Sequence, residues 1–214
     1  MRGLHLAAAL SLLAGCTHVR AVRTLAAGET ELAIDEGGPI VLGVGAQRAL
    51  FPFGSPGLAL RHGFERGEIH GAVHALPAAF GVVWLEAGGS FRLFDQRGAR
   101  PYLLTTLAVH AATDGPHWVG ATQLTLVASW AHREGRVVPY LGWDSILAFP
   151  DVRYVGAAFA GVRVGSKVFL APELRWLLPW ERVEPVAFRP LSPGRGVLGL
   201  GLSIGARFPL ADAR

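Results

Sequence analysis

Two histidines and a glutamate stand close together in a segment where apolar and polar residues alternate. Glu68, His70 and His74 are separated by even numbers of residues, so an extended chain places all three on one face. Imidazole and carboxylate groups are common metal ligands, but this set needs a further ligand from a neighbouring strand. The only cysteine, Cys16, lies far away along the chain. The sequence therefore predicts no metal site and no cofactor.

A nearby serine and histidine raise the question of hydrolase chemistry. A nucleophile and its base must lie within hydrogen-bond reach. Ser129 and His132 are an odd number of positions apart, so a strand points them to opposite faces. Gly199 and Gly201 lack the strand-to-helix context of a nucleotide-binding loop and indicate close strand packing. No catalytic residue is predicted, and enzymatic activity is left open.

The composition favours a membrane protein built from strands. Hydrophobic residues make up 51% of the 214 residues and charged residues 17%, which is charge-poor for a water-soluble domain. No stretch approaches the roughly 20 uninterrupted apolar residues that a membrane helix needs. The apolar residues are instead spread over alternating segments that 28 glycines and 14 prolines interrupt. A net charge of +4 without any basic run argues against a nucleic-acid partner.

The closing segment, Gly196 to Phe208, shows the alternation most clearly. Leucines and an isoleucine dominate one face, and glycines with Ser203 and Arg207 dominate the other. The same pattern predicts ten strands: Glu29–Gly45, Pro56–Gly63, Glu68–Ala75, Phe80–Phe94, Ala99–Ala112, His117–His132, Val137–Phe149, Arg153–Val164, Val168–Leu178 and Gly196–Phe208. The predicted fold is all-β, an antiparallel up-and-down transmembrane β-barrel of about ten strands, within a range of roughly 8 to 12.

The predicted turns differ between the two ends of such a barrel. FERG, DQRG, REGR and GSK are tight, charged turns after every second strand, whereas the other connections are more varied. Gln47 to Ser55 and Pro179 to Arg195 are predicted to be irregular. Membrane barrels have short periplasmic turns and longer external loops. With an even number of strands, both ends of the barrel segment therefore lie on the periplasmic side.

Alternation also predicts which charged side chains face the lumen. In a membrane barrel the apolar face meets lipid and the polar face points inward. The mixed signs of the inward set indicate paired charges in a lumen about wide enough for side chains alone. The predicted lumen network is Glu31, Asp35, Arg61, Glu68, His70, His74, Glu86, Arg92, Asp144, Arg163, Glu173, Arg175 and Arg207.

Two tryptophans predict the edges of the membrane. Trp118 and Trp130 share one face of a predicted strand with two leucines. They are about 12 residues apart, which at a tilt of about 40° separates them by roughly 30 Å along the membrane normal. That separation matches the two aromatic girdles of a membrane barrel. Trp118, Trp130 and Phe208 are therefore the predicted girdle residues.

At the N-terminus, Leu13-Ala14-Gly15-Cys16 follows a short apolar core and resembles the lipobox of a bacterial lipoprotein signal peptide. That resemblance implies cleavage before Cys16 and its acylation, and a lone exported cysteine has no disulfide partner. The alternative is an ordinary signal peptide that happens to precede a cysteine. The predicted organisation is a signal peptide at 1–15, a lipidated tether at 16–28, the barrel at 29–208 and a short tail at 209–214.

Taken together, residues 29–208 resemble small bacterial outer-membrane β-barrel proteins. The resemblance rests on the Gly- and Arg-containing pattern LRHGFERGE and on a final strand that ends at the aromatic Phe208. It implies contact with membrane lipid in the bacterial outer membrane. Thr17, where an aspartate would favour inner-membrane retention, agrees with that location, with the lipid anchor on the periplasmic side.

Three classes of function fit this sequence. The first is a lipid-anchored barrel of structural or interaction type with a narrow, charge-filled lumen, whose 179–195 loop is a candidate surface for a protein partner. The second is a narrow channel or a lipid-modifying enzyme of the outer membrane. The third is a soluble, lipocalin-like periplasmic barrel on a lipid anchor, which needs apolar side chains inside and charges outside. Nothing in the sequence indicates a ligand or an oligomeric state.

Overall fold

A computed structural model describes residues 20–44, 47–52, 56–75, 81–150, 152–181 and 188–209. Within these residues the chain forms twelve strands: β1 (Glu29–Val44), β2 (Gln47–Pro52), β3 (Gly57–Gly63), β4 (Gly67–His74), β5 (Val83–Phe94), β6 (Tyr102–Thr113), β7 (Trp118–Ser129), β8 (Val137–Phe149), β9 (Arg153–Gly165), β10 (Val168–Leu177), β11 (Phe188–Pro190) and β12 (Val197–Pro209). In the same residues, no helix is long and apolar enough to span a membrane.

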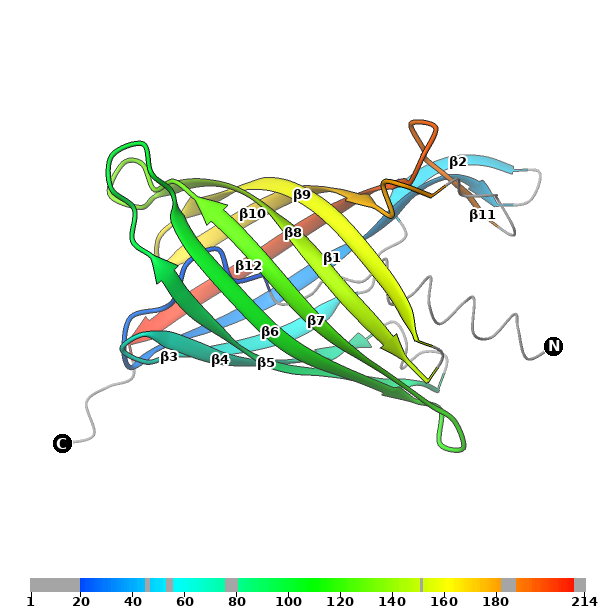
Figure 1. Cartoon of the computed structure of the whole chain (residues 1–214), viewed down its shortest axis with the longest axis horizontal. Helices are drawn as coiled ribbons and strands as arrows, with labels where there is room; N and C mark the ends of the chain where they lie inside the picture. The colour runs from blue at the N-terminus through cyan, green and yellow to red at the C-terminus, as the bar shows by residue number, and fades with distance from the viewer. Residues whose placement is uncertain are drawn as a thin grey trace.

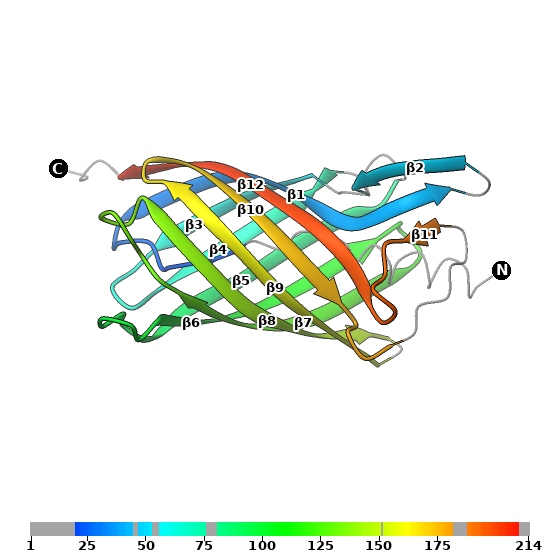
Figure 2. The same ribbon diagram turned by 90° about the horizontal axis from the view of Figure 1, so that it is seen from above.

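Ten of these strands close into an antiparallel barrel (Figure 1, Figure 2). From β3 to β10 each strand pairs with its neighbour in the chain, and β12 pairs with β10. β1 completes the ring because it pairs with β12 over residues 29–39 and with β3 over residues 30–35. A closed ring leaves no free sheet edge around the barrel. The predicted ten-strand antiparallel barrel is confirmed.

The two remaining strands extend the sheet beyond the ring. β1 is 16 residues long, and its pairing with β12 stops at Pro39. Beyond that point β1 pairs with β2 and with β11 instead. These partners satisfy backbone groups that the end of β1 would otherwise leave unpaired. The predictions that residues 47–55 form a loop and that residues 179–195 are wholly irregular are therefore wrong where β2 and β11 lie.

Side chains alternate across the barrel wall. Along β10, buried and exposed residues follow one another at every position. Glu173 and Arg175 point inward, whereas Leu174 between them is half-exposed on the outside. On β6, Leu107 is 58% exposed at the middle of the strand. The outer face is therefore apolar and the inner face carries the charges, which contradicts the lipocalin-like alternative.

The four predicted charged turns all lie at one end of the barrel, but the prediction that this end has the shorter connections is wrong for two of the strand pairs at the other end. The connections from β3 to β4, β5 to β6, β7 to β8 and β9 to β10 contain two to seven residues and lie at one end, on the left in Figure 1. β1 begins and β12 ends there, since Glu29 pairs with Pro209. We call this the short-turn end and the opposite one the far end. At the far end, β6 to β7 and β8 to β9 are joined by only four and three residues. The extension formed by β1, β2 and β11 lies at the far end (Figure 1).

Residues 20–25 lie inside the barrel, and the chain continues through the exposed residues 26–28 to the short-turn end, where β1 begins (Figure 1). Arg20, Ala21, Val22 and Leu25 are buried. The buried apolar cluster that contains Ala21 and Val22 is completed by residues of β6 to β9: Tyr102, Leu104, Val127, Val138, Tyr140 and Phe159. The prediction of a tether over residues 16–28 is therefore wrong for this part. Cys16, the signal peptide and residues 210–214 lie outside the described residues.

Candidate functional site in the barrel interior

The candidate site is the polar interior of the barrel. Eleven of the thirteen predicted lumen residues are buried: Glu31, Asp35, Arg61, Glu68, His70, His74, Glu86, Asp144, Arg163, Glu173 and Arg175. Each occupies an inward position of its strand, because side chains two apart on a strand share a face. Strand register then decides which of them meet.

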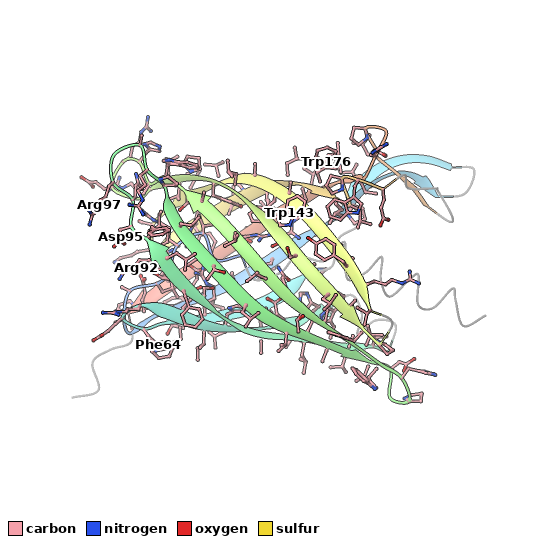
Figure 3. All side chains as sticks on the ribbon, viewed as in Figure 1. Phe64, Arg92, Asp95, Arg97, Trp143 and Trp176 are labelled. Carbon is pink, nitrogen blue, oxygen red and sulfur yellow. The ribbon has the colours of Figure 1, made fainter. Side chains whose placement is uncertain are left out.

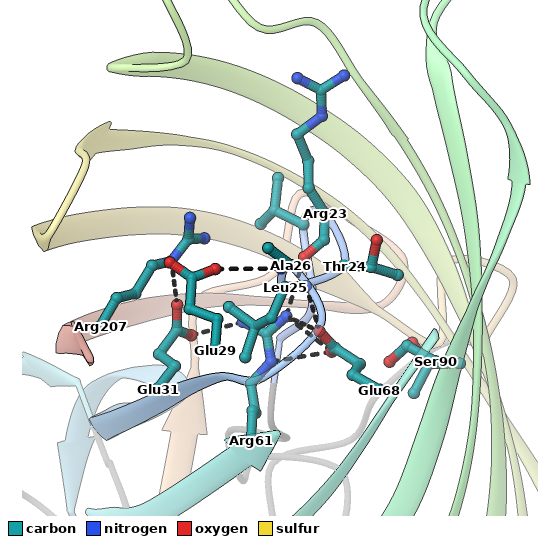
Figure 4. Close-up of polar contacts among 12 residues, drawn as sticks. Arg23, Thr24, Leu25, Ala26, Glu29, Glu31, Arg61, Glu68, Ser90 and Arg207 are labelled. Carbon is teal, nitrogen blue, oxygen red and sulfur yellow. Dashed lines mark hydrogen bonds and ion pairs between the residues drawn. The ribbon is translucent and has the colours of Figure 1, made fainter. Parts of the chain in front are cut away.

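Glu31 lies at the centre of a group of arginines near the short-turn end (Figure 4). Its carboxylate accepts hydrogen bonds from Arg61 Nη1 at 2.5 Å, Arg163 Nη2 at 2.5 Å and Arg207 Nε at 2.8 Å. Glu68 accepts from Nε and Nη2 of Arg61 at 2.9 and 2.7 Å. Arg207 itself is only partly buried at the rim. Three guanidinium groups and two carboxylates thus form one network.

The N-terminal segment is bonded into this network through its backbone. The carbonyl oxygen of Arg23 accepts a hydrogen bond from Nη2 of Arg61 at 3.0 Å. The backbone N–H of Leu25 donates to Oε2 of Glu68 at 3.0 Å (Figure 4). Charged side chains of the barrel wall therefore satisfy peptide groups that would otherwise be buried without partners.

A second ion-pair network lies deeper in the barrel. Arg20 Nη2 is 2.9 Å from Oδ2 of Asp144, and Arg20 Nε is 3.1 Å from Oε2 of Glu173. Arg175 Nε is 2.5 Å from the other oxygen of Glu173. Two guanidinium groups and two carboxylates balance one another here, away from water. Removing any one of them leaves a buried charge uncompensated.

Three buried histidines surround Glu86, not Glu68. Nε2 of His70 is 3.4 Å from one oxygen of Glu86, and Nε2 of His74 and Nδ1 of His110 are 3.6 and 3.9 Å from the other. Glu68 is instead bound by an arginine, so the predicted face of Glu68, His70 and His74 does not form one cluster. Among the residues that the structure describes, no group of three or more His, Cys, Asp or Glu residues is arranged to hold a metal ion.

Arg92 does not belong to the lumen network. Its side chain is exposed at the short-turn end, where Nη1 lies 3.2 Å from Oδ1 of Asp95 (Figure 3). The pairing of β5 with β6 is irregular between Arg92 and Phe94. At the rim the side chain can reach water, so an inward position no longer enforces burial. The lumen assignment of Arg92 is wrong.

Ser129 and His132, the two residues considered for hydrolase chemistry, lie apart in the structure. Ser129 is buried, and its hydroxyl donates to the carbonyl oxygen of Val22 at 3.1 Å. His132 is exposed in the turn after β7. Ser129 therefore binds the N-terminal segment, and no nucleophile–base contact forms between these two residues.

The predicted girdle residues lie at opposite ends of the outer surface. Trp118 begins β7 at the far end and is 65% exposed. Phe208 is half-exposed near the end of β12, at the short-turn end. Trp130 follows β7 at that same end and donates its indole N–H to the carbonyl oxygen of Ala99 at 2.9 Å.

Further aromatic residues at the far end were not among the predicted ones. Trp180 stacks on Tyr154 with ring centroids 5.7 Å apart, and its ring lies 5.9 Å from that of Trp143. Trp176 donates its indole N–H to the carbonyl oxygen of Arg195 (Figure 3). Trp143 and Trp176 lie on outward positions of predicted strands, so the alternation that placed Trp118 could also have found them.

The interior also contains polar residues that the predicted network lacks. Gln123 and Thr125 donate to Oδ1 of Asp144 at 3.1 and 2.6 Å, and His110 Nε2 lies 2.9 Å from Oε1 of Gln123. Their inward positions on β6 and β7 could have revealed them. Arg20 precedes the first strand, where alternation carries no information.

Side chains fill the middle of the barrel. A cavity of about 570 Å³ opens at the short-turn end, between the N-terminal segment and the turns. Deeper, beside Arg20 and Glu31, a second cavity measures only about 10 Å³. In the described part of the chain, the interior thus supports packing and ion pairing rather than a wide water path.

No protein-family model matches the chain, and no curated protein matches it. Solved structures match weakly. An outer membrane channel from Pseudomonas putida F1 gives a TM-score of 0.44 at 13% identity, covering 90% of this chain and 100% of that one. The translocator domain of the autotransporter NalP from Neisseria meningitidis gives 0.43 at 10% identity, covering 97% and 95%. OmpT, an outer membrane protein of Vibrio cholerae, gives 0.35 at 8% identity, and the chain spans 56% of its length.

At these scores the barrel assignment rests on the strand pairing of the chain itself. The ring closes through β1, and its inner face carries paired charges. The chain is a closed, ten-strand antiparallel β-barrel with a charged interior, an architecture that it shares with bacterial outer-membrane barrels.

Proposed function

We propose that this protein is an integral β-barrel of the bacterial outer membrane, of structural or interaction type, with a lumen closed by its own side chains. The observation that carries the proposal is the inverted distribution of polarity. Leu107, Ile34 and Leu174 are half-exposed or more on the outer face, while Glu31 and Arg61 are buried inside. Water-soluble proteins keep such charges at the surface and rarely expose large contiguous apolar patches. A closed barrel also pairs its backbone N–H and C=O groups within the sheet. This pairing is necessary in the hydrocarbon core of a membrane, where no water is present to bind these groups.

The aromatic residues support two membrane interfaces. Trp118 and the group of Trp143, Tyr154 and Trp180 lie toward the far end, and Phe208 lies toward the short-turn end. Tryptophan and tyrosine favour the interface because one side of the ring is apolar and the other is polar. In membrane barrels with an even number of strands both ends of the barrel segment lie on the periplasmic side, so the end opposite to the start of β1 and the end of β12 faces outward.

The filled lumen favours a structural or interaction role over a channel. The buried carboxylates of Glu31, Asp144 and Glu173 are matched by guanidinium groups at 2.5 to 3.1 Å. The far-end connection at residues 179–195 remains the candidate surface for a protein partner, and Trp180 within it is exposed. A steady current through the wild-type protein in a planar bilayer would contradict the closed lumen.

The lipid anchor at Cys16 belongs to the same proposal. The sequence Leu13-Ala14-Gly15-Cys16 supports it. Four residue steps from Cys16 to Arg20 span at most about 14 Å, so an acyl group would have to lie close to the barrel. Radioactive palmitate should label the wild type and not Cys16→Ser. Equal labelling of both proteins would rule out the anchor.

The membrane location is tested without the anchor. Cys16→Ser, exported through a replaced signal peptide, should remain in the outer membrane after a carbonate wash, because the apolar outer face holds it there. The same fractionation of the acylated wild type provides the reference. Recovery of the unacylated protein in the soluble periplasmic fraction would refute the transmembrane barrel.

A further inference from the structure

Arg20 is bound along both edges of its guanidinium group. Nη1 and Nη2 donate to the two oxygens of Asp144 at 3.0 and 2.9 Å. Nε and Nη2 donate to the two oxygens of Glu173 at 3.1 and 3.3 Å. Two carboxylates thus meet the guanidinium fork in paired hydrogen bonds, a geometry that a single ammonium group cannot reproduce.

The flat face of the same group is also bound. The guanidinium carbon of Arg20 lies 3.6 Å from the centroid of the Phe159 ring. Stacking on an aromatic face favours a planar, weakly hydrated cation over a compact, strongly hydrated one. Asp144, Glu173 and Phe159 therefore match the charge, the hydrogen-bond pattern and the planarity of a guanidinium group.

The barrel wall holds this site in place without help from Arg20. Asp144 accepts hydrogen bonds from Thr125 Oγ1 at 2.6 Å and from Gln123 Nε2 at 3.1 Å. Glu173 accepts from Arg175 Nε at 2.5 Å. All of these partners lie on barrel strands. The two carboxylates are therefore oriented before the ligand arrives, which lowers the cost of binding.

The segment that carries Arg20 behaves as a ligand of the barrel rather than as one of its strands. Residues 20–28 belong to no strand, and several of their peptide groups are bound by side chains of the wall, such as Leu25 by Glu68 and Val22 by Ser129. The cavity of about 570 Å³ lies beside the segment and opens at the short-turn end. The cavity is lined by residues 22–27 of the segment, so this part of the segment is accessible from the short-turn end.

We propose that the lumen contains a guanidinium-binding site formed by Asp144, Glu173 and Phe159, and that Arg20 on the N-terminal segment is its built-in occupant. The ligand class is a guanidinium group on an extended peptide. This site goes beyond the proposed role in the membrane, because it requires only the interior of the barrel. Without Arg20, Asp144 and Glu173 lose the guanidinium group that binds both carboxylates, which leaves Asp144, Glu173 and Arg175 with one net negative charge that a cation can balance.

The test is rescue of a full-length variant by the missing group. Arg20→Ala should lower the thermal unfolding midpoint of the protein in detergent. Guanidinium chloride at millimolar concentration, far below denaturing levels, should recover at least half of that loss, because a ligand that binds only the folded state stabilises it. Sodium chloride and methylammonium chloride at equal ionic strength should not. The wild type, whose site is filled, should gain nothing.

Two further variants separate a site from a general salt effect. Arg20→Ala combined with Asp144→Asn should not respond to guanidinium, because one wall of the site is lost. Arg20→Lys retains the charge and tests the geometry even if Arg20→Ala does not fold. Its midpoint should lie below that of the wild type. Equal midpoints for Arg20→Lys and the wild type would overturn the proposal, as would equal rescue of Arg20→Ala by sodium.

Discussion

Removal of Arg61 should destabilise the barrel more than removal of any charge on its turns. Arg61 donates to Glu31 at 2.5 Å, to Glu68 at 2.7 and 2.9 Å, and to the carbonyl oxygen of Arg23 at 3.0 Å. In Arg61→Leu, Glu31 keeps Arg163 and Arg207 as partners. The loss therefore falls on Glu68, a fully buried carboxylate that is left with the N–H of Leu25.

The size of this effect follows from burial. Breaking a buried ion pair by removing one partner costs about 3–5 kcal/mol, because the other charge stays buried and uncompensated. A second change, Glu68→Gln, removes that charge, and the double variant should recover more than half of the loss. The remaining cost is that of a buried polar group with too few partners, about 1–3 kcal/mol.

Urea unfolding in lipid vesicles, followed by tryptophan fluorescence, measures these free energies of unfolding. Arg97→Leu, at an exposed turn position, is the matched control and should stay within about 0.5 kcal/mol of the wild type. The reasoning would be refuted if Arg61→Leu unfolded like Arg97→Leu. It would also fail if Glu68→Gln lowered the stability of Arg61→Leu further, since the carboxylate would then not be the source of the cost.

Three further predictions test the outer face, the packing and a loop. Leu202→Arg places a charge on the exposed face of β12, should lower the stability of the membrane-inserted barrel by about 2–4 kcal/mol and should block assembly. Ser203→Arg should be better tolerated, because Ser203 points toward Asp35. The yield of each variant in the outer membrane measures the difference. Gly88→Ala should cost about 1–3 kcal/mol in urea unfolding, because a Cβ there would lie 2.5 Å from the carbonyl oxygen of Leu107, while Gly71→Ala meets its nearest atom at an ordinary 3.5 Å and should be nearly neutral. In the loop after β6, the backbone N–H of His117 donates to Asp114 and lowers the pKa of that carboxyl. The contact is therefore present at neutral pH and lost as the pH falls through that lowered pKa; amide exchange at His117 should show this loss, and Asp114→Asn should abolish its pH dependence.

Local patterns predicted the wall of the barrel well. On β10 and β12 each residue faces either the apolar or the polar side, and a period of two is visible in the sequence without knowledge of any neighbour. The positions of four connections at one end also follow from short charged segments with glycine. Strand number and inward positions could therefore be predicted, because each depends on residues close together in the chain.

Contacts between strands could not be predicted in the same way. His70 and His74 share a face with Glu68, yet they meet Glu86, because β4 pairs with β5 so that Ala72, between the two histidines, stands opposite Glu86. Arg61 meets Glu31 because these two residues are direct partners across β3 and β1. A shift of register would change every such pair, and alternation alone does not specify the register.

The sequence by itself determined that this chain forms a barrel with an apolar outside and a charged inside, because both follow from alternation along single strands. The tertiary structure alone decided what fills the lumen. Arg20 belongs to no strand, and its side chain finds Asp144 and Glu173 more than a hundred positions away only after the ring has closed. Arg92 shows the reverse, since its inward position at the rim leaves it in water beside Asp95. Burial at these two positions depends on depth within the closed barrel, which is a property of the assembled wall and of no single strand.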